Sequence, residues 1–157
     1  MKTKYFLIFV FLIFSFITFG NSRALAQAKK LTVSNLKGSD YLGCGCSFQT
    51  LAEAKKPRSM KIVFWSEDRK TAVLNVNGKD TTFKLVKEGK RPTNQKIGSR
   101  FSDQYAANGI TINIDYLTTH VCKPGEEDCE ATSYNATIAA TKGKLKTIIK
   151  TKGACGC

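Results

Sequence analysis

Hydrophobic and polar residues alternate along most of the chain with a period of two, which is typical of β-strands that bury one face. In residues 110–116, for example, Ile110, Ile112, Ile114 and Tyr116 share one face. A helical period is almost absent. The pattern predicts eight strands, over residues 42–49, 60–66, 71–77, 80–87, 99–106, 110–121, 131–141 and 144–152.

Turn-forming dipeptides stand between several of these segments. Asn77-Gly78 lies between two alternating runs, and both residues tolerate the positive φ of a type I′ hairpin turn. Asn108-Gly109 and Lys142-Gly143 mark two more hairpins. Residues 51–59 are expected to contain one helical turn, and residues 88–96 an exposed loop. Short antiparallel strands joined by tight turns predict an all-β fold, a small antiparallel barrel or sandwich.

The first residues of the chain have the pattern of an export signal. Lys2 and Lys4 precede an apolar run over residues 5–19, and Ala-x-Ala sites follow at 24–26 and 26–28. The run is shorter than the roughly 20 residues of a membrane-spanning helix, so a retained anchor is the less favoured alternative. We expect a signal peptide over residues 1–26 and one secreted or periplasmic domain over 27–157, with no transmembrane span after cleavage.

The six cysteines are an even number and all follow the predicted signal, which favours disulfide bonds in an oxidising compartment. The alternatives are a thiolate metal site and a redox-active Cys-Gly-Cys. A bond between Cys122 and Cys129 would close a short loop. The predicted disulfide residues are Cys44, Cys46, Cys122, Cys129, Cys155 and Cys157.

The strand pattern places both Cys-Gly-Cys pairs on inward faces. Cys44 and Cys46 share a face with Phe48, and Cys155 and Cys157 continue the inward parity of the last strand. If these two strands pair antiparallel, the bonds are Cys44–Cys157 and Cys46–Cys155. If they pair parallel, the bonds are Cys44–Cys155 and Cys46–Cys157. Both pairings are staples between distant parts of the chain.

Basic residues exceed acidic ones, and some of them follow a pattern. The chain holds 25 Lys and Arg and 12 Asp and Glu; without residues 1–26, 22 basic and 12 acidic residues remain, giving a charge of +10. Leu145, Thr147 and Ile149 are predicted to face inward on the last strand, with lysines facing outward. The candidate anion-binding residues are Lys142, Lys144, Lys146, Lys150 and Lys152.

Such a lysine row can bind a polyanion, such as anionic lipid headgroups, lipopolysaccharide phosphates or acidic glycans. Alternatively, the lysines only protect the strand against edge-to-edge aggregation. A second basic cluster over residues 84–100 favours the binding hypothesis. Nucleic acid is not expected as a partner, because no aromatic stacking motif accompanies the lysines.

The sequence shows no pattern of a catalytic centre. Its one histidine, His120, has the parity of a strand residue, and no nucleophile-elbow glycines occur. The acids of residues 126–130 have no metal-loop spacing and indicate a solvated turn. We therefore expect no enzymatic activity, no cofactor and no metal.

Residues 41–132 resemble the bacterial periplasmic inhibitors of c-type lysozyme, a family of small β-barrels. The resemblance rests on short motifs: Tyr-Leu-Gly-Cys at 41–44, Asn-Gly-Lys at 77–79, Gly-Ser-Arg-Phe at 98–101, Lys-Pro-Gly at 123–125 and Glu-Ala-Thr at 130–132. It implies a binding protein whose partner is a protein at the cell envelope.

In that family a loop serine and a later lysine enter the lysozyme cleft. Lys123 matches the lysine, while Ile97 stands at the serine position and Ser99 lies two residues further on. The resemblance thus implies a partner-binding surface made of Ile97, Gly98, Ser99, Arg100, Phe101 and Lys123.

Overall fold

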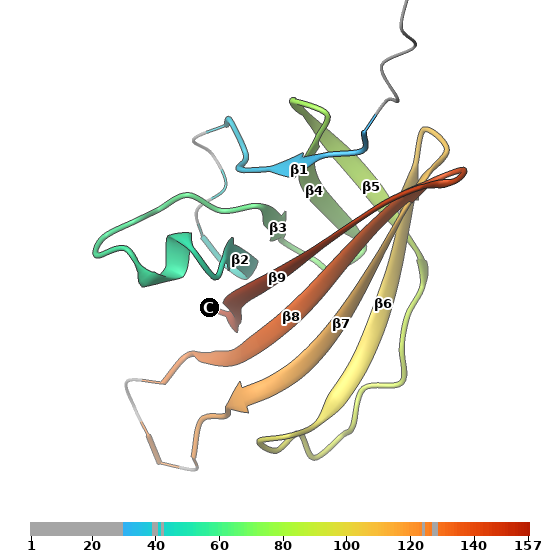
Figure 1. Cartoon of the computed structure of the whole chain (residues 1–157). Coiled ribbons are helices and arrows are strands. Elements are labelled where there is room, and N and C mark those ends of the chain that lie inside the picture. The colour runs from blue at the N-terminus through green and yellow to red at the C-terminus, as the bar shows by residue number, and fades with distance from the viewer. Residues whose placement is uncertain (1–29, 39–40, 42, 124, 127–128) are drawn as a thin grey trace, which may run out of the picture.

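The alternating segments form nine β-strands (Figure 1). The structure is a computed structural model that describes residues 30–38, 41, 43–123, 125–126 and 129–157. The predicted signal peptide, residues 1–26, lies outside the described residues. The strands are β1 (Val33–Ser34), β2 (Gly45–Thr50), β3 (Phe64–Ser66), β4 (Thr71–Val76), β5 (Lys79–Lys87), β6 (Arg100–Ala107), β7 (Ile110–His120), β8 (Ala131–Lys142) and β9 (Leu145–Gly156).

Most strand bounds agree with the predicted ones to within one residue, but β2 begins at Gly45 rather than at residue 42, β9 continues to Gly156 rather than ending at residue 152, and the chain also differs near β1 and β3. β1 is too short to produce an alternation in the sequence. The predicted strand over residues 60–66 is reduced to β3. Before it, Ile62 makes a single backbone bond rather than a ladder: Leu36 N–H donates to the Ile62 carbonyl at 2.8 Å. Met60 is accordingly 69% exposed. The expected helical turn is the 3₁₀ turn η2 (Glu53–Lys55).

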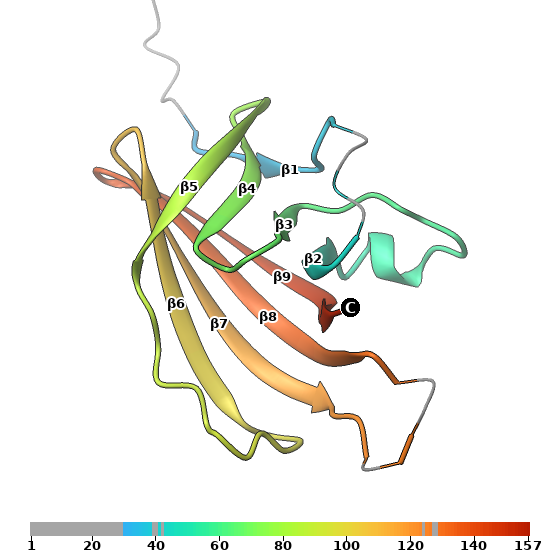
Figure 2. The same cartoon turned by 180° about the vertical axis from the view of Figure 1, so that it is seen from behind.

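The sheet closes on itself. From β2 to β9 each strand pairs antiparallel with the next strand in sequence, and β9 returns to pair with β2. The result is an eight-stranded up-and-down barrel (Figures 1 and 2). β1 is an additional strand, paired with the end of β4. This confirms the predicted all-β fold and decides between the two architectures in favour of the barrel.

The predicted hairpin turns are present. Asn77 and Gly78 have φ of 52° and 81°, and Asn108 and Gly109 have φ of 52° and 70°. Positive φ at both central residues is the requirement of a type I′ turn. Gly143 also has a positive φ, of 56°, between β8 and β9.

Inward-facing side chains of all eight strands fill the barrel. Ile112 and Ile114 of β7 and Ile138 of β8 are fully buried. Part of the filling is aromatic: Phe101 stacks on Tyr116 with ring centres 4.5 Å apart. We call Phe48, Phe101, Tyr116 and Tyr134 the aromatic cluster, since their rings contact one another.

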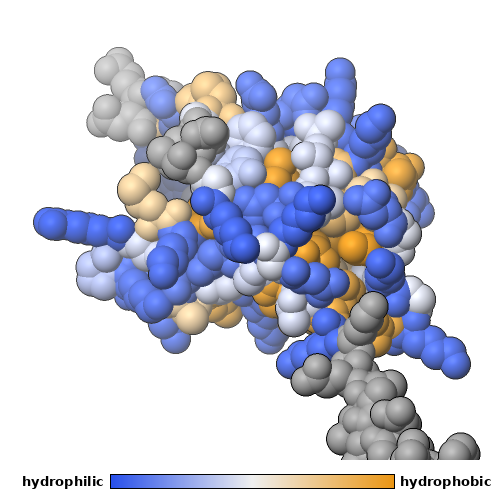
Figure 3. Space-filling view, turned by 90° about the horizontal axis from the view of Figure 1, so that it is seen from above, coloured by the Kyte–Doolittle hydropathy of each residue, from blue (hydrophilic) through white to orange (hydrophobic). Residues whose placement is uncertain are grey.

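The segment that contains β1 crosses the upper end of the barrel, where the β4–β5, β6–β7 and β8–β9 hairpins also lie (Figure 1). Leu31 is 2% exposed and belongs to the core. Its carbonyl accepts a hydrogen bond from Thr147 Oγ1 of β9, and the carbonyl of Thr32 accepts one from Asn77 N–H. Seen from above, hydrophilic side chains surround this end, with hydrophobic residues between them (Figure 3). The segment therefore joins both sides of the barrel.

Two disulfides hold the pairing of β2 with β9, which we call the seam. Cys44 bonds Cys157 and Cys46 bonds Cys155, the connectivity predicted for antiparallel strands. Only the inner bond faces the interior: Cys46 is 2% exposed, whereas Cys44 and Cys157 are exposed. The expectation that both pairs face inward fails for the outer bond, because β2 begins only at Gly45 and its alternation does not extend to Cys44.

The third disulfide joins Cys122 to Cys129, as predicted. No free cysteine occurs among the described residues. A helix with the length and hydrophobicity of a membrane span is likewise not found in the described part of the chain.

Candidate functional site

The predicted lysine row lies on the outside of the β8–β9 hairpin. We call Lys142, Lys144, Lys146, Lys150 and Lys152 the lysine face; all five are exposed. Leu145 and Ile149, at the intervening positions of β9, are partly buried and pack against the core. The alternation of inward apolar and outward basic residues is therefore present as predicted.

The residues across from the lysine face are uncharged. Lys146 lies opposite Thr141, Lys150 opposite Thr137, and Lys152 opposite Asn135 on β8. On the other side of β9, Lys152 lies opposite Gln49 of β2. The salt bridges between described residues, Lys56–Glu53 and Arg69–Asp103, do not involve this face. The five lysines therefore form no salt bridge with a described residue, and Asp115 of β7 is the described carboxylate that lines a groove with Lys150.

A shallow groove of about 210 Å³ connects the lysine face to β6. Arg100 and Lys150 both line this groove, together with the carboxylate of Asp115. The strand register also aligns Arg100 with Leu117 of β7 and, through Asn135, with Lys152. Arg100 was predicted from the resemblance as part of a protein contact, but the barrel places it beside the lysine face. Ile148, 56% exposed, adds an apolar side chain between Lys146 and Lys150.

The other predicted contact residues lie at the lower end of the barrel (Figures 1 and 2). Ile97 is 68% exposed at the tip of a turn. Backbone bonds of 2.9 Å tie this turn to β7: Gly98 N–H donates to the Thr118 carbonyl, and Thr118 N–H donates to the Ser99 carbonyl. Lys123 is exposed in the segment that follows β7.

Phe101 is not on that surface. It is 7% exposed and packs in the aromatic cluster, because β6 directs Phe101, Asp103 and Tyr105 inward and Arg100 outward. Of the residues implied by the resemblance, Phe101 thus serves the core. Ile97, Gly98 and Lys123 remain accessible to a partner.

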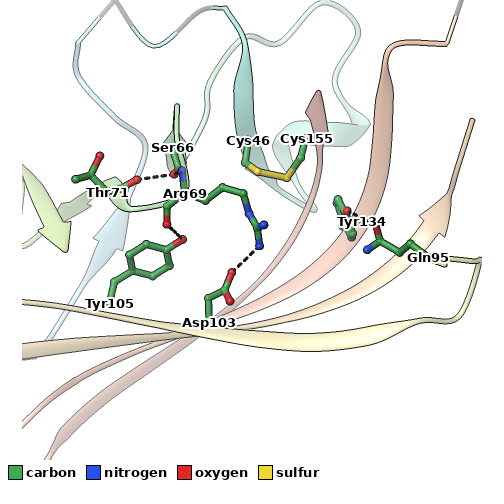
Figure 4. The surroundings of a disulfide bond; sticks show 9 residues. All are labelled: Cys46, Ser66, Arg69, Thr71, Gln95, Asp103, Tyr105, Tyr134 and Cys155. Atoms are coloured by element: carbon green, nitrogen blue, oxygen red, sulfur yellow. Dashed lines mark hydrogen bonds and ion pairs between the residues drawn. A yellow bond between two sulfur atoms is a disulfide. The ribbon is translucent and has the colours of Figure 1, made fainter. Parts of the chain in front are cut away.

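Polar residues inside the barrel form a second cluster, which the sequence analysis missed (Figure 4). Arg69, in the turn between β3 and β4, reaches across to Asp103 of β6, with 3.1 Å between Nη2 and Oδ2. Arg69 has a φ of 62°, a conformation that is costly for a residue with a side chain. Two contacts hold it there: its N–H donates to Ser66 Oγ, and its carbonyl accepts a bond from Tyr105 Oη, both at 3.0 Å.

The surroundings of this cluster change the pKa values of two nearby tyrosines. Burial raises the pKa of Tyr105 to about 12, and the neighbouring negative charge of Asp103 acts in the same direction. Burial also raises the pKa of Tyr116 well above its usual value, and the charge of the nearby Tyr105 is the second largest cause of this rise. Tyr134 donates its hydroxyl to Gln95 Oε1 at 3.1 Å.

Arg91 approaches the same region from the loop after β5. Its guanidinium carbon lies 4.5 Å from the centre of the Phe101 ring, within the range of a cation–π contact. The sequence contained one signal for this cluster: Asp103 stands at an inward position between Phe101 and Tyr105, where an acid requires a buried partner.

Among the described residues, His120, Glu126 and Cys129 place potential metal ligands within 4.8 Å of one another. The sulfur of Cys129 is bonded to Cys122, however, and so cannot serve as a thiolate ligand. This group therefore gives no basis for a metal site.

Comparisons of the chain with family models, curated proteins and solved structures found no match. The resemblance to lysozyme inhibitors therefore stays a prediction. The three disulfides are consistent with an oxidising, exported environment.

Proposed function

We propose that the protein is an exported, non-enzymatic binding protein that attaches to an anionic component of the cell envelope through the lysine face. The observation that supports this proposal is the lysine face itself: five exposed lysines on one hairpin, opposite uncharged residues.

The spacing of these charges favours a polyanion over a single small anion. Alternate residues of a strand lie roughly 6.7 Å apart, so Lys150 and Lys152 lie within one screening length, about 8 Å at physiological salt. Charges this close act together on an extended row of phosphates or carboxylates. Ile148 and the methylene stems of the lysines offer apolar contact to a lipid or a glycolipid.

The test is sedimentation with phosphatidylglycerol vesicles, with phosphatidylcholine vesicles as the uncharged reference. The variant Lys144→Gln/Lys146→Gln/Lys150→Gln/Lys152→Gln should lose binding by at least about tenfold, because four charges leave the contact. Wild-type binding should also fall steeply from 50 to 500 mM salt, as the screening length shrinks from about 14 to about 4 Å.

A matched control removes four charges elsewhere: Lys37→Gln/Lys61→Gln/Lys70→Gln/Lys79→Gln. These lysines are also exposed and lie outside the β8–β9 hairpin. The control should bind within about threefold of the wild type. Equal weakening of both variants would mean that net charge alone drives binding, and no vesicle binding by the wild type would also reject the proposal.

An inhibitor-like contact with a c-type lysozyme is the second candidate. It is supported by the exposure of Ile97 in a turn held firmly against β7. In a turbidity assay of cell-wall lysis, the wild type should block lysozyme and Ile97→Asp/Lys123→Ala should not. The lysine-face variant should still block. Absence of inhibition by the wild type rejects this candidate.

A further inference from the structure

Two arginine side chains meet one aromatic ring inside the lower end of the barrel. The guanidinium carbons of Arg91 and Arg69 lie 4.5 Å and 5.8 Å from the centre of the Phe101 ring. Arg69 comes from the turn between β3 and β4, and Arg91 from the loop after β5. Two separate loops therefore bring positive charge to the same place, next to the aromatic cluster.

The described residues supply only one buried carboxylate here, that of Asp103, and both of its oxygens are occupied. Oδ2 accepts from Arg69 Nη2 at 3.1 Å, and Oδ1 accepts from the backbone N–H of Gly89 at 3.1 Å. The carboxylate of Asp103 is thus paired with Arg69, and the described residues give the guanidinium of Arg91 no counter-charge of its own. Arg91 forms no salt bridge with a described residue.

Three nitrogen atoms of these arginines are buried without a hydrogen-bond acceptor among the described residues: Nε of Arg69, and Nε and Nη2 of Arg91. Buried donors normally have a partner, since an unpaired one loses its hydration without compensation. In Arg91, Nε and Nη2 belong to the same edge of the guanidinium. Their two N–H groups are parallel, which is the geometry that binds both oxygens of a carboxylate.

We propose that this end of the barrel binds a small organic carboxylate, with its two oxygens on the Nε–Nη2 edge of Arg91. One such anion supplies the two acceptors that Arg91 lacks and neutralises its charge. The ring of Phe101 holds the guanidinium plane, and Arg69 adds a second positive charge nearby, itself fixed by Asp103. The aromatic cluster offers apolar contact to the rest of the ligand. The interior of an eight-stranded barrel is just wide enough to be filled by side chains or to hold one small ligand.

The experiment uses octanoate and benzoate as probes, with octanol and benzyl alcohol as uncharged references. Isothermal titration calorimetry measures the affinity for the folded, oxidised protein. The carboxylates should bind saturably and the alcohols at least about tenfold more weakly, because only the carboxylates carry the charge-assisted pair of hydrogen bonds. In the NMR spectrum of the wild type, the Nε–H signal of Arg91 should shift with the same affinity.

Arg91→Met should weaken carboxylate binding by at least about tenfold. Arg91→Lys should also weaken it, because lysine keeps the charge but lacks the two parallel N–H donors of the guanidinium edge. The matched control is Arg58→Met, which removes an exposed arginine from the loop after η2 and should leave binding unchanged. Arg91→Lys and the wild-type NMR titration keep the test valid if Arg91→Met does not fold.

The lysine-face variant should retain octanoate binding, so this site and the envelope contact succeed or fail separately. The proposal would be overturned if the wild type bound neither carboxylate with a Kd below about 10 mM, which is already a weak affinity for a specific site. Equal affinity of the wild type and both Arg91 variants would overturn it as well.

Discussion

The two seam disulfides should stabilise the barrel in a strongly non-additive way. The outer bond, Cys44–Cys157, encloses the inner bond, Cys46–Cys155, with only one glycine between the cysteines on each side. Either bond alone closes a loop of similar length in the unfolded chain. Once one bond is present, the second closes only the small ring formed by the two Cys-Gly-Cys pairs.

The chain-entropy relation gives the size of this difference. A loop with the sequence separation of the inner bond, 109 residues, corresponds to about 4.8 kcal/mol of stabilisation. A ring of about six residues corresponds to about 2.2 kcal/mol. Loss of one seam bond should therefore lower the free energy of unfolding by about 2 kcal/mol, and loss of both by about 7 kcal/mol.

A double-mutant cycle measures the coupling. The variants are Cys44→Ser/Cys157→Ser, Cys46→Ala/Cys155→Ala and the combination of both. Removing the outer bond should cost about 2 kcal/mol when the inner bond is present and about 5 kcal/mol when it is absent. The packing lost at buried Cys46 cancels in this comparison.

Urea denaturation without reductant gives the four free energies, and mass spectrometry verifies the remaining bonds. Because a loss of about 7 kcal/mol approaches the whole stability of many domains, all four proteins are measured in a stabilising osmolyte. If the outer bond costs the same in both backgrounds, to within about 0.5 kcal/mol, the nested-loop reasoning is wrong.

Two further predictions concern a turn and the interior. Gly78→Val should lower the free energy of unfolding by roughly 1–3 kcal/mol, because Gly78 has a φ of 81°, while Gly78→Asn should cost less; unchanged denaturation midpoints would contradict this. Tyr105 has its pKa raised to about 12 in the folded state, so the unfolded chain loses the phenol proton first as the pH rises. The contribution of Tyr105 to the free energy of unfolding should be fully present below about pH 10 and should fall by up to about 1.4 kcal/mol per pH unit between about 10 and 12. Tyr105→Phe should reduce that fall in denaturation curves taken at several pH values, and an equally steep fall in the variant would contradict the assignment.

The strands could be predicted because each has a clear local signal. β7 alternates over its whole length, and Asn77-Gly78 fixes the position of a hairpin without any knowledge of the rest of the chain. β1 has only two residues and depends on its bonds to β4, so the sequence near it contains no comparable signal. Local patterns predict strands well where the strand is long.

Such local patterns could not predict which strands pair to close the barrel. The pairing of β2 with β9 joins residues more than 100 positions apart, and only the cysteine parity pointed to it. The interior arginines were missed for a similar reason. Arg69 and Arg91 lie in loops, where no periodicity indicates an inward direction, and their contacts with Phe101 and Asp103 exist only in the closed barrel.

The seam also determines what an opened molecule would do. Without the pairing of β2 and β9, the barrel is a single curved sheet with two free edges. Each edge carries the unpaired N–H and C=O groups that match the other edge in antiparallel register. Within one molecule the two edges close a ring, but between molecules they join head to tail without limit. Under reducing conditions, any molecule in which β2 and β9 separate would therefore expose the two edges that make it the repeating unit of a filament.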